Sequence, residues 1–370
     1  MNKTKLTNSQ ITIVTSGFIF GSAPLFIASS VAVYAKQDAW ISVIFSTIIG
    51  ILIIWINTSL GRLYPNKSLI EVISLIFGKW LGKVVSIIFI FITLVTATQV
   101  TWYVGDFITT TYLPEMSTYP INILFIAVVA IAMLYGLEAM CRACTIFFTF
   151  LFPIYVIILL MLIPDIRVTN LLPMFENGIV PILKGTIPQL SLTTFPVIVL
   201  NMVYPSHAEN VKQSKKTLFY GYLLGMLATL VGVLMTILVL GSNFTASSRF
   251  PLFIITQEIN VGVIFSRLEA VVIAVWLTTK FISTFFYFYA GSIGLSQLLM
   301  LDDYRKLVLP LVLIIAVFSN FIYKNVPYQI NWDSYVWPLV IFTFGFVLPV
   351  ILLLTYGIKK WLGKRKVISK

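Results

Sequence analysis

Charged and metal-ligating residues are scarce in this 370-residue sequence. Charged residues make up 10% of the chain and hydrophobic residues 59%, whereas a typical soluble domain carries about 25% charged residues. So little polar surface excludes a soluble globular protein. The single histidine, His207, and two cysteines, Cys141 and Cys144, fall short of the roughly four ligands of a metal site. We therefore expect no metal and no other cofactor. We expect the two cysteines to have a structural role.

Catalytic motifs are also missing. One histidine gives no His–Asp or His–Glu constellation, and the sequence has neither a phosphate-binding loop nor metal-ligand spacing. We expect a protein that is not an enzyme.

Long apolar runs fill the sequence instead. A helix needs about 20 apolar residues to cross about 30 Å of hydrocarbon, and we assign ten such spans. Between the second and third, Leu69, Val72, Ile73 and Ile76 share one face of a helix within 61–80, which predicts an amphipathic helix at the membrane interface. The expected fold is an all-α integral membrane protein with ten transmembrane helices in one domain, 1–370. The predicted spans are 11–34, 40–60, 81–111, 120–140, 143–163, 179–204, 217–240, 262–290, 307–323 and 335–358.

Basic residues predict the orientation. With both termini inside, 18 Lys and Arg residues fall on the inner side and six on the outer side, with Lys280 inside a span. The bias follows the positive-inside rule and places both termini in the cytoplasm. The net charge of +12 then reflects topology and attraction to anionic lipid, so no nucleic-acid partner is expected.

The first span carries an interruption. It reads Gly17-Phe-Ile-Phe-Gly21-Ser22-Ala23-Pro24, and a proline removes one backbone hydrogen bond and clashes with the preceding turn. In lipid, a broken helix persists only where it is buried in protein or lines a cavity. The segment is therefore either a ligand site or a simple proline kink.

The sixth span carries a second interruption, at Thr193-Thr194-Phe195-Pro196. Spans one and six each open a block of five and cross in opposite directions, which predicts a five-plus-five inverted repeat with broken helices 1 and 6. The repeats cover about 8–164 and 178–324, followed by an extra helix at 335–358. Free N–H groups at half-helix ends suit a carboxylate and unwound carbonyls suit an ammonium, so an amino acid matches both.

Lys280 lies in the middle of the eighth span. A charge at mid-bilayer costs at least about 2.5–3.5 kcal/mol, so its side chain should face the interior or a cavity. In repeats of this kind a sodium ion is often held between helices 1 and 8, and the ammonium would replace it; the alternative is a buried structural pair. Asp106 either meets a ligand amine or lies near the headgroups. The candidate ligand-binding residues are Gly21, Ser22, Ala23, Trp102, Tyr103, Asp106, Thr193, Thr194, Phe195, Lys280 and Thr284.

Other motifs have structural explanations. Glu138 and Arg142, four residues apart, predict an ion pair at an inner helix end. Arg267 and Glu269 open the eighth span as an anchor or gate. Gly221 and Gly225 form a small-residue face for helix packing.

Several short segments together resemble the spore germination permeases, the B subunits of nutrient germinant receptors, within the amino acid–polyamine–organocation transporter superfamily. The resemblance covers about residues 8–358 and depends on the order and spacing of individually weak motifs. Members often have a Pro-Phe-Gly-Glu-like element in span six, but Thr193–Pro196 contains no acidic residue. The matching segments are Gly61-Arg-Leu-Tyr-Pro65, Leu113-Pro114, Gly136-Leu-Glu138 with Arg142, Leu172-Pro-Met-Phe-Glu-Asn-Gly178, and Arg267-Leu-Glu-Ala270 with Trp276.

The resemblance implies a nutrient sensor of the spore inner membrane. Its partners would be the A and C subunits of a germinant receptor, and its ligand a small amino acid, or a nucleoside or sugar. A proton-coupled amino acid transporter is the alternative, because a receptor can keep a transporter's site without its transport cycle.

Overall fold

A computed structural model describes residues 5–21, 25–204, 206–209, 211–257 and 268–368. Apart from one β-bridge between Leu6 and Ala208, the regular elements of these residues are helices. The first half comprises α1 (Asn8–Gly21), α2 (Ile27–Ala35), η1 (Lys36–Asp38), α3 (Ala39–Leu63), α4 (Leu69–Phe77), α5 (Lys79–Thr111), α6 (Thr118–Tyr135), α7 (Leu137–Met161), η2 (Ile163–Asp165) and η3 (Val168–Leu171). The second half comprises α8 (Ile179–Gln189), η4 (Leu190–Thr194), η5 (Phe195–Met202), α9 (Val211–Leu240), α10 (Ser242–Ser247), α11 (Pro251–Gln257), α12 (Leu268–Leu298), η7 (Tyr304–Leu307), α13 (Val308–Phe318), α14 (Val326–Asn331), η8 (Trp332–Val336), α15 (Trp337–Phe342), η9 (Thr343–Val347) and α16 (Leu348–Ile368).

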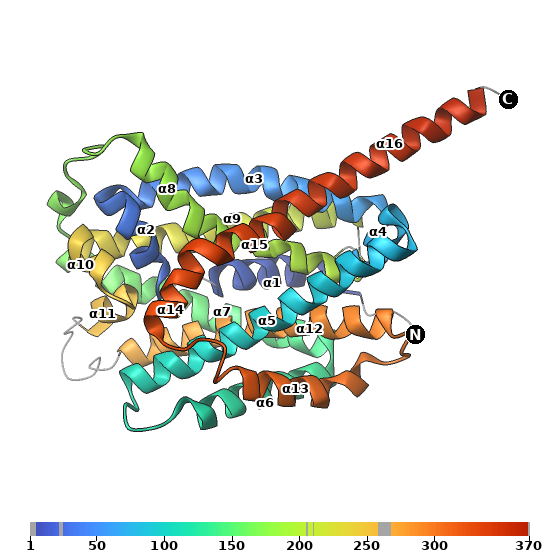
Figure 1. Cartoon of the computed structure of the whole chain (residues 1–370). Helices are drawn as coiled ribbons and strands as arrows, with labels where there is room; N and C mark the ends of the chain where they lie inside the picture. Colours follow the sequence, from blue (N-terminus) through green and yellow to red (C-terminus); the bar gives the residue numbers. More distant parts are fainter. Residues whose placement is uncertain (1–4, 22–24, 205, 210, 258–267, 369–370) are drawn as a thin grey trace.

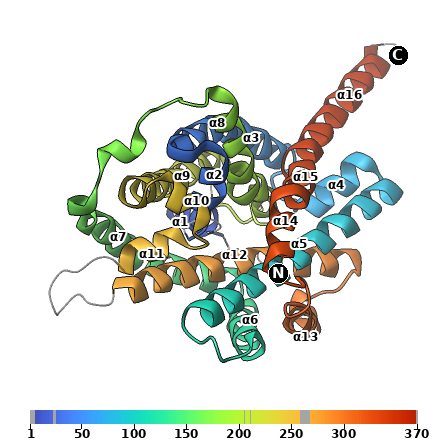
Figure 2. The same ribbon diagram turned by 60° about the vertical axis from the view of Figure 1, so that its left-hand side comes forward.

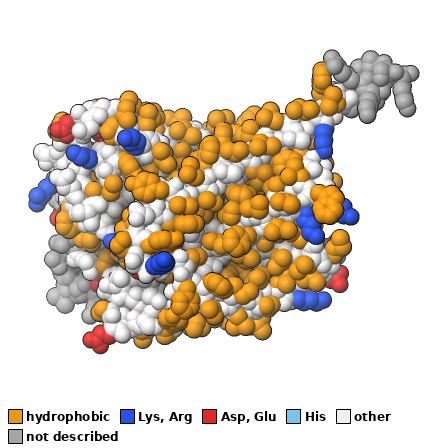
Figure 3. Space-filling model, in the orientation of Figure 1, with side chains coloured by type: hydrophobic (Ala, Val, Ile, Leu, Met, Phe, Trp, Pro, Cys, Tyr) orange, Lys and Arg blue, Asp and Glu red, His pale blue; other side chains and the backbone are white. Residues whose placement is uncertain are grey.

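The long helices form a bundle with an apolar outer band. Most of them run along one direction, and α1 begins and α16 ends at the same end of the bundle (Figure 1). Hydrophobic side chains cover the middle of the surface, while Lys and Arg gather mainly towards the two ends (Figure 3). A bilayer core of about 30 Å requires such a band. The protein is therefore a multi-pass membrane protein.

Eight segments of the described residues are long and apolar enough to span a membrane. The difference from ten arises at two predicted spans. The first is divided between α1 and α2, and the ninth corresponds to the 11-residue α13, which packs beside α6 at the edge of the bundle (Figure 2). Each of these helices is shorter than a bilayer-crossing helix, so ten crossings and the inverted repeat stay predictions.

The first span is interrupted where its sequence predicts. Helix α1 ends at Gly21 and α2 begins at Ile27; Ser22, Ala23 and Pro24 lie outside the described residues. A Cβ at Gly21 would lie 2.5 Å from the Thr279 carbonyl oxygen and 2.8 Å from Ser283 Oγ. Only glycine therefore allows α1 to approach α12 this closely.

The sixth span changes helix type rather than unwinding. Helix α8 continues into the π-helical turn η4 and then the 3₁₀ helix η5, and the Phe195 N–H donates to the Leu190 carbonyl. Because Pro196 offers no N–H, a wider turn followed by a tighter one keeps backbone groups paired inside the membrane. The unwound centre expected for helix 6 is therefore wrong for the described backbone. Both η4 and η5 contact α1, so the two interrupted spans are neighbours.

The C-terminal segment begins earlier than predicted. An apolar segment runs from Val326 to Leu362 instead of 335–358, and Asn325 caps its start by accepting a hydrogen bond from the Tyr328 N–H. The earlier start places Asp333 inside the helix. At the other end, α16 extends beyond the rest of the bundle (Figures 1 and 2).

Two smaller predictions are confirmed, and the helix expected within 61–80 is present, while its position at the membrane interface stays a prediction. The apolar face of α4 is buried, and Ser68 and Glu71 form a capping box at its start. Glu138 pairs with Arg142. A Cβ at Gly221 would lie 2.5 Å from a backbone carbonyl of α1, which shows close packing of α9 on α1. Arg267 lies outside the described residues.

Candidate functional site

Two neighbouring cavities lie among the first, third, sixth, eighth and C-terminal spans. The larger has a volume of about 500 Å³, within the range of small-molecule sites. Its wall contains four charged residues, Asp106, Lys184, Arg249 and Asp333. The remaining lining residues are Phe26, Ser29, Ser30, Val33, Tyr34, Tyr103, Ile187, Pro188, Leu192, Ala246, Ser247, Ser248, Phe250, Trp276, Gln329, Ile330, Ser334 and Tyr335.

The smaller cavity lies beside Lys280. Its volume is about 40 Å³, enough for a few water molecules, since one water needs about 10–15 Å³. Four residues line both cavities: Phe26, Tyr103, Leu192 and Asp333. The small cavity is completed by Thr96, Gln99, Val100, Lys280, Ser283, Tyr287 and Trp337.

Phe26 and Tyr103 form a stacked pair in the shared wall. Their ring centroids are 5.7 Å apart with 27° between the ring planes. Phe26 follows the interruption of the first span, and Tyr103 belongs to α5. The two rings therefore join the first and third spans between the cavities.

Aromatic rings surround the Lys280 ammonium. Lys280 is 2% exposed, and its Nζ lies 4.9 Å from the ring centroid of Phe26 and 5.7 Å from those of Tyr103 and Trp276. None of the ion pairs among the described residues involves Lys280. The electron-rich faces of the rings stabilise a cation, and through Phe26 the ammonium bridges the first and eighth spans.

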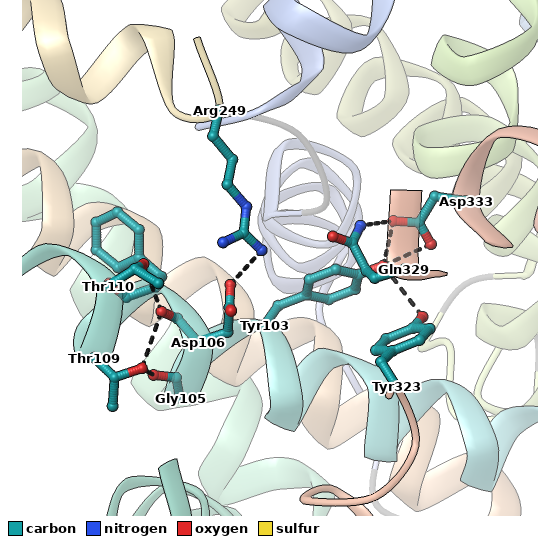
Figure 4. Close-up of polar contacts among 10 residues, drawn as sticks. Tyr103, Gly105, Asp106, Thr109, Thr110, Arg249, Tyr323, Gln329 and Asp333 are labelled. Carbon is teal, nitrogen blue, oxygen red and sulfur yellow. Dashed lines mark hydrogen bonds and ion pairs between the residues drawn. The ribbon is translucent and has the colours of Figure 1, made fainter. Parts of the chain in front are cut away.

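Asp333 anchors the C-terminal segment to α5 (Figure 4). The Tyr103 hydroxyl lies 2.7 Å from Oδ1 and 2.6 Å from Oδ2 of Asp333. Gln329 Nε2 also donates to Oδ2, and the Tyr323 hydroxyl lies 3.4 Å from that of Tyr103. A carboxylate inside a membrane protein needs such donors to offset its burial.

A second carboxylate of the large cavity is already neutralised. Asp106 Oδ2 lies 2.5 Å from Arg249 Nη2, and their side chains are 9% and 30% exposed. The Arg249 guanidinium also lies 5.1 Å from the Phe250 ring centroid. The pair connects α5 to the segment between α10 and α11 (Figure 4).

The cavities include only some of the residues predicted from the sequence. Tyr103 and Asp106 line the large cavity, and Tyr103 and Lys280 line the small one. The other described candidates are not among the lining residues of either cavity. Gly21 packs on α12, Trp102 on Tyr323, Thr193 on Met226, Thr194 on Tyr222 and Phe195 on Phe342, and the Thr284 hydroxyl donates to the Lys280 carbonyl.

Sequence reasoning missed Asp333, Gln329, Phe26 and Leu192. For Asp333 a signal was available: Asn325-Val-Pro is a helix start with an N-cap and a proline in the first turn. A helix beginning there places Gln329 and Asp333 one turn apart on the same face.

Comparisons with known proteins agree with this architecture. The chain is 26% identical to spore germination protein KB of Bacillus subtilis over 100% of this chain and 98% of that protein. It is also 26% identical to spore germination protein YndE of the same organism, covering 96% and 97% of the two chains. The fold resembles that of Mhp1, a nucleobase-cation-symport-1 family transporter solved in a closed conformation with bromovinylhydantoin bound. That match has a TM-score of 0.66 and 9% identity and covers 89% of this chain and 74% of Mhp1.

The family is shown by a match over most of the chain. The family model described as spore germination protein matches residues 5–328. This range contains Phe26, Tyr103 and Lys280 and ends before Asp333. The chain belongs to the spore germination permease family.

Proposed function

We propose that this protein is the nutrient-sensing, permease-like subunit of a spore germinant receptor, located in the spore inner membrane with both termini cytoplasmic. Its family and its transporter fold support a permease-like role in germination. One observation carries the sensing site: a cavity of about 500 Å³ has the partly buried Asp333 carboxylate in its wall and lies next to the buried Lys280 ammonium.

The ligand in this proposal is a small amino acid. It binds beside the interruptions of spans 1 and 6, where three of the residues predicted from the sequence, Tyr103, Asp106 and Lys280, line the cavities. Phe26 beside the first interruption and Leu192 within the second line both cavities, with Tyr103 from span 3. Asp333 and Lys280 offer opposite charges in one cavity wall, which matches a zwitterion. A nucleoside or sugar would contact fewer of these charged groups.

Sensing requires the ligand to prefer one arrangement of the helices. The wall between the cavities joins four separate spans through Phe26, Tyr103, Lys280 and Asp333. A ligand that inserts there changes the balance between arrangements by its differential affinity. By linkage, the same free energy reaches the A and C subunits bound to this chain.

Deletion and complementation test the proposal. Spores that lack this gene should lose their response to one class of nutrient, and the parental gene should restore it. Germination is followed by the fall in optical density and the release of dipicolinic acid. Retention of every nutrient response, in spores without related receptors, would contradict a sensing role. Co-purification of the A and C subunits tests the partners.

A proton-coupled amino acid transporter is the second candidate, favoured by the fold shared with a symporter. Purified protein in liposomes with an imposed proton gradient separates the two functions. Accumulation of radiolabelled amino acid would identify a transporter, whereas a sensor binds the amino acid without accumulating it.

A further inference from the structure

We infer that Asp333 receives the ammonium group of the bound nutrient, so that the C-terminal segment supplies the ligand's anionic contact. The inference rests on the proposed function and assigns the chemistry of the same site. The sixth span, 179–204, contains no acidic residue. A carboxylate from a different span lies in the wall that both cavities share.

Asp333 keeps hydrogen-bonding capacity for a ligand. A carboxylate accepts about four hydrogen bonds. The Tyr103 hydroxyl has a single proton, so its two contacts with Asp333 amount to one shared hydrogen bond. Gln329 supplies a second. The Tyr323 hydroxyl also lies within hydrogen-bonding reach of Asp333. At least one acceptor position therefore remains, and an ammonium carries three donors.

Asp106, the other acidic residue in the cavity walls, fits this role less well. Its charge is compensated by Arg249 at 2.5 Å, so a ligand ammonium would have to compete with a guanidinium. The nearest donors to Asp333 are the neutral groups of Tyr103 and Gln329. The Lys280 ammonium also lines the small cavity, but no ion pair joins it to Asp333 among the described residues. Asp333 thus offers the less compensated negative charge.

The opposite end of an amino acid also finds a partner. The Trp276 side chain lines the large cavity, and its Nε1–H is buried without a hydrogen-bond acceptor in the described part of the chain. An indole N–H can only donate, so it suits a carboxylate oxygen. The Lys280 ammonium, 5.7 Å from the Trp276 ring, adds positive charge on this side. The ligand class is therefore a compound with a primary ammonium and a carboxylate.

The test measures binding to the purified full-length protein. The probes are the common L-amino acids and the matching 2-hydroxy acids, in which a hydroxyl replaces the ammonium. The quantity of interest is the affinity ratio between the best amino acid and its hydroxy acid. Asp333→Asn keeps the side-chain shape but removes the charge. Because charge-assisted hydrogen bonds are the strong ones, the ratio should fall about ten- to hundredfold.

Tyr103→Phe separates ligand recognition from anchoring. It removes the hydroxyl that contacts Asp333 while keeping the ring stacked on Phe26. If Asp333 only anchors α5, both variants should change the ratio alike. If Asp333 binds the ammonium, Tyr103→Phe should keep most of the amino acid preference, because the carboxylate is still present. Asp303→Asn, on the partly exposed η7 cap, is the matched control for loss of one acidic residue.

Each outcome has a clear consequence. A ratio that falls in Asp333→Asn and persists in Tyr103→Phe supports the inference. An unchanged ratio in Asp333→Asn, or an equal fall in both variants, overturns it while leaving the proposed function intact. Parental protein that binds none of the amino acids would instead overturn an amino acid sensor and this inference with it. If Asp333→Asn does not fold, Asp333→Glu gives the readout. Its shifted carboxylate should keep the amino acid preference, and loss of that preference would overturn the inference.

Discussion

Replacing Lys280 by methionine separates a role in nutrient response from a role in folding. Methionine keeps the length and apolar stem of lysine and removes only the charge. Lys280 Nζ lies within 5.7 Å of three ring centroids, and methionine sulfur also packs well against aromatic rings. The variant therefore changes electrostatics more than packing.

The expected change in stability is small because two terms oppose each other. A desolvated cation–π contact contributes about 2 kcal/mol, which the variant loses. A charge at mid-bilayer costs at least about 2.5–3.5 kcal/mol, which the variant no longer bears. The net change in the free energy of unfolding should stay within about 2 kcal/mol by these terms. We expect parental protein levels in the membrane.

The nutrient response should be severely reduced. Without the ammonium, the first and eighth spans lose the charge that bridges them through Phe26, and the small cavity keeps only the negative charge of Asp333. We expect at least about a tenfold higher nutrient concentration for a half-maximal response, equivalent to about 1.4 kcal/mol. Lys280→Arg should restore part of the response, since a planar guanidinium replaces a compact ammonium.

Spores that carry each variant provide the assay. Immunoblots of inner-membrane fractions report protein level, and the fall in optical density with nutrient concentration reports the response. Replacing Na⁺ by K⁺ should not change the parental response if, as we expect, the ammonium takes the place of a bound sodium ion. A Lys280→Met protein with a parental response, or a parental response that requires Na⁺, would refute the reasoning. Loss of the variant from the membrane would show that Lys280 serves folding.

Three further predictions follow from side-chain packing. Asp106→Asn or Arg249→Gln leaves one partly buried charge unpaired and should lower the free energy of unfolding by about 1–3 kcal/mol, measured by thermal unfolding. The double variant should recover stability, and additive losses of stability would contradict the pairing. Gly345→Ala places a methyl group against the Phe195 backbone and should cost about 1–3 kcal/mol by overpacking, while the control Gly357→Ala, in open space, should not. Leu192→Ala should change the ranking of nutrients by size. The Phe195 ring packs on Phe342, so Phe195→Ala should lower the protein level instead. If only Phe195→Ala changed the ranking by size, this assignment would be reversed.

The sequence predicted the features that depend on local chemistry. Gly21 marks the end of α1, and the apolar face predicted within 61–80 is the buried face of α4: Leu69, Val72, Ile73 and Ile76. Because a charge inside an apolar span is costly, Lys280 is expected to face the protein interior or a cavity, and its side chain is buried. In each case, burial cost or backbone geometry acts within a few residues of the signal.

The sequence could not predict which side chains of the sixth span face the cavities. A π turn adds one residue without advancing the helix by a normal step, which rotates all later side chains relative to a 3.6-residue period. Leu192 lines both cavities, while Phe195 packs on Phe342. Asp333 was missed because apolar runs set the predicted helix start, although Asn325 caps the helix earlier.

Protection of one engineered cysteine from maleimide labelling most directly tests the central claim, that the nutrient binds in the cavities. Leu192→Cys places a thiol in the wall of both cavities, while the native Cys141 and Cys144 are buried and should react slowly. Glu115→Cys, at an exposed turn after α5, serves as the control. If nutrient binds in the cavities, the germinant amino acid should slow maleimide labelling of Leu192→Cys and leave Glu115→Cys unchanged. Equal labelling rates with and without a saturating germinant would contradict the proposed site.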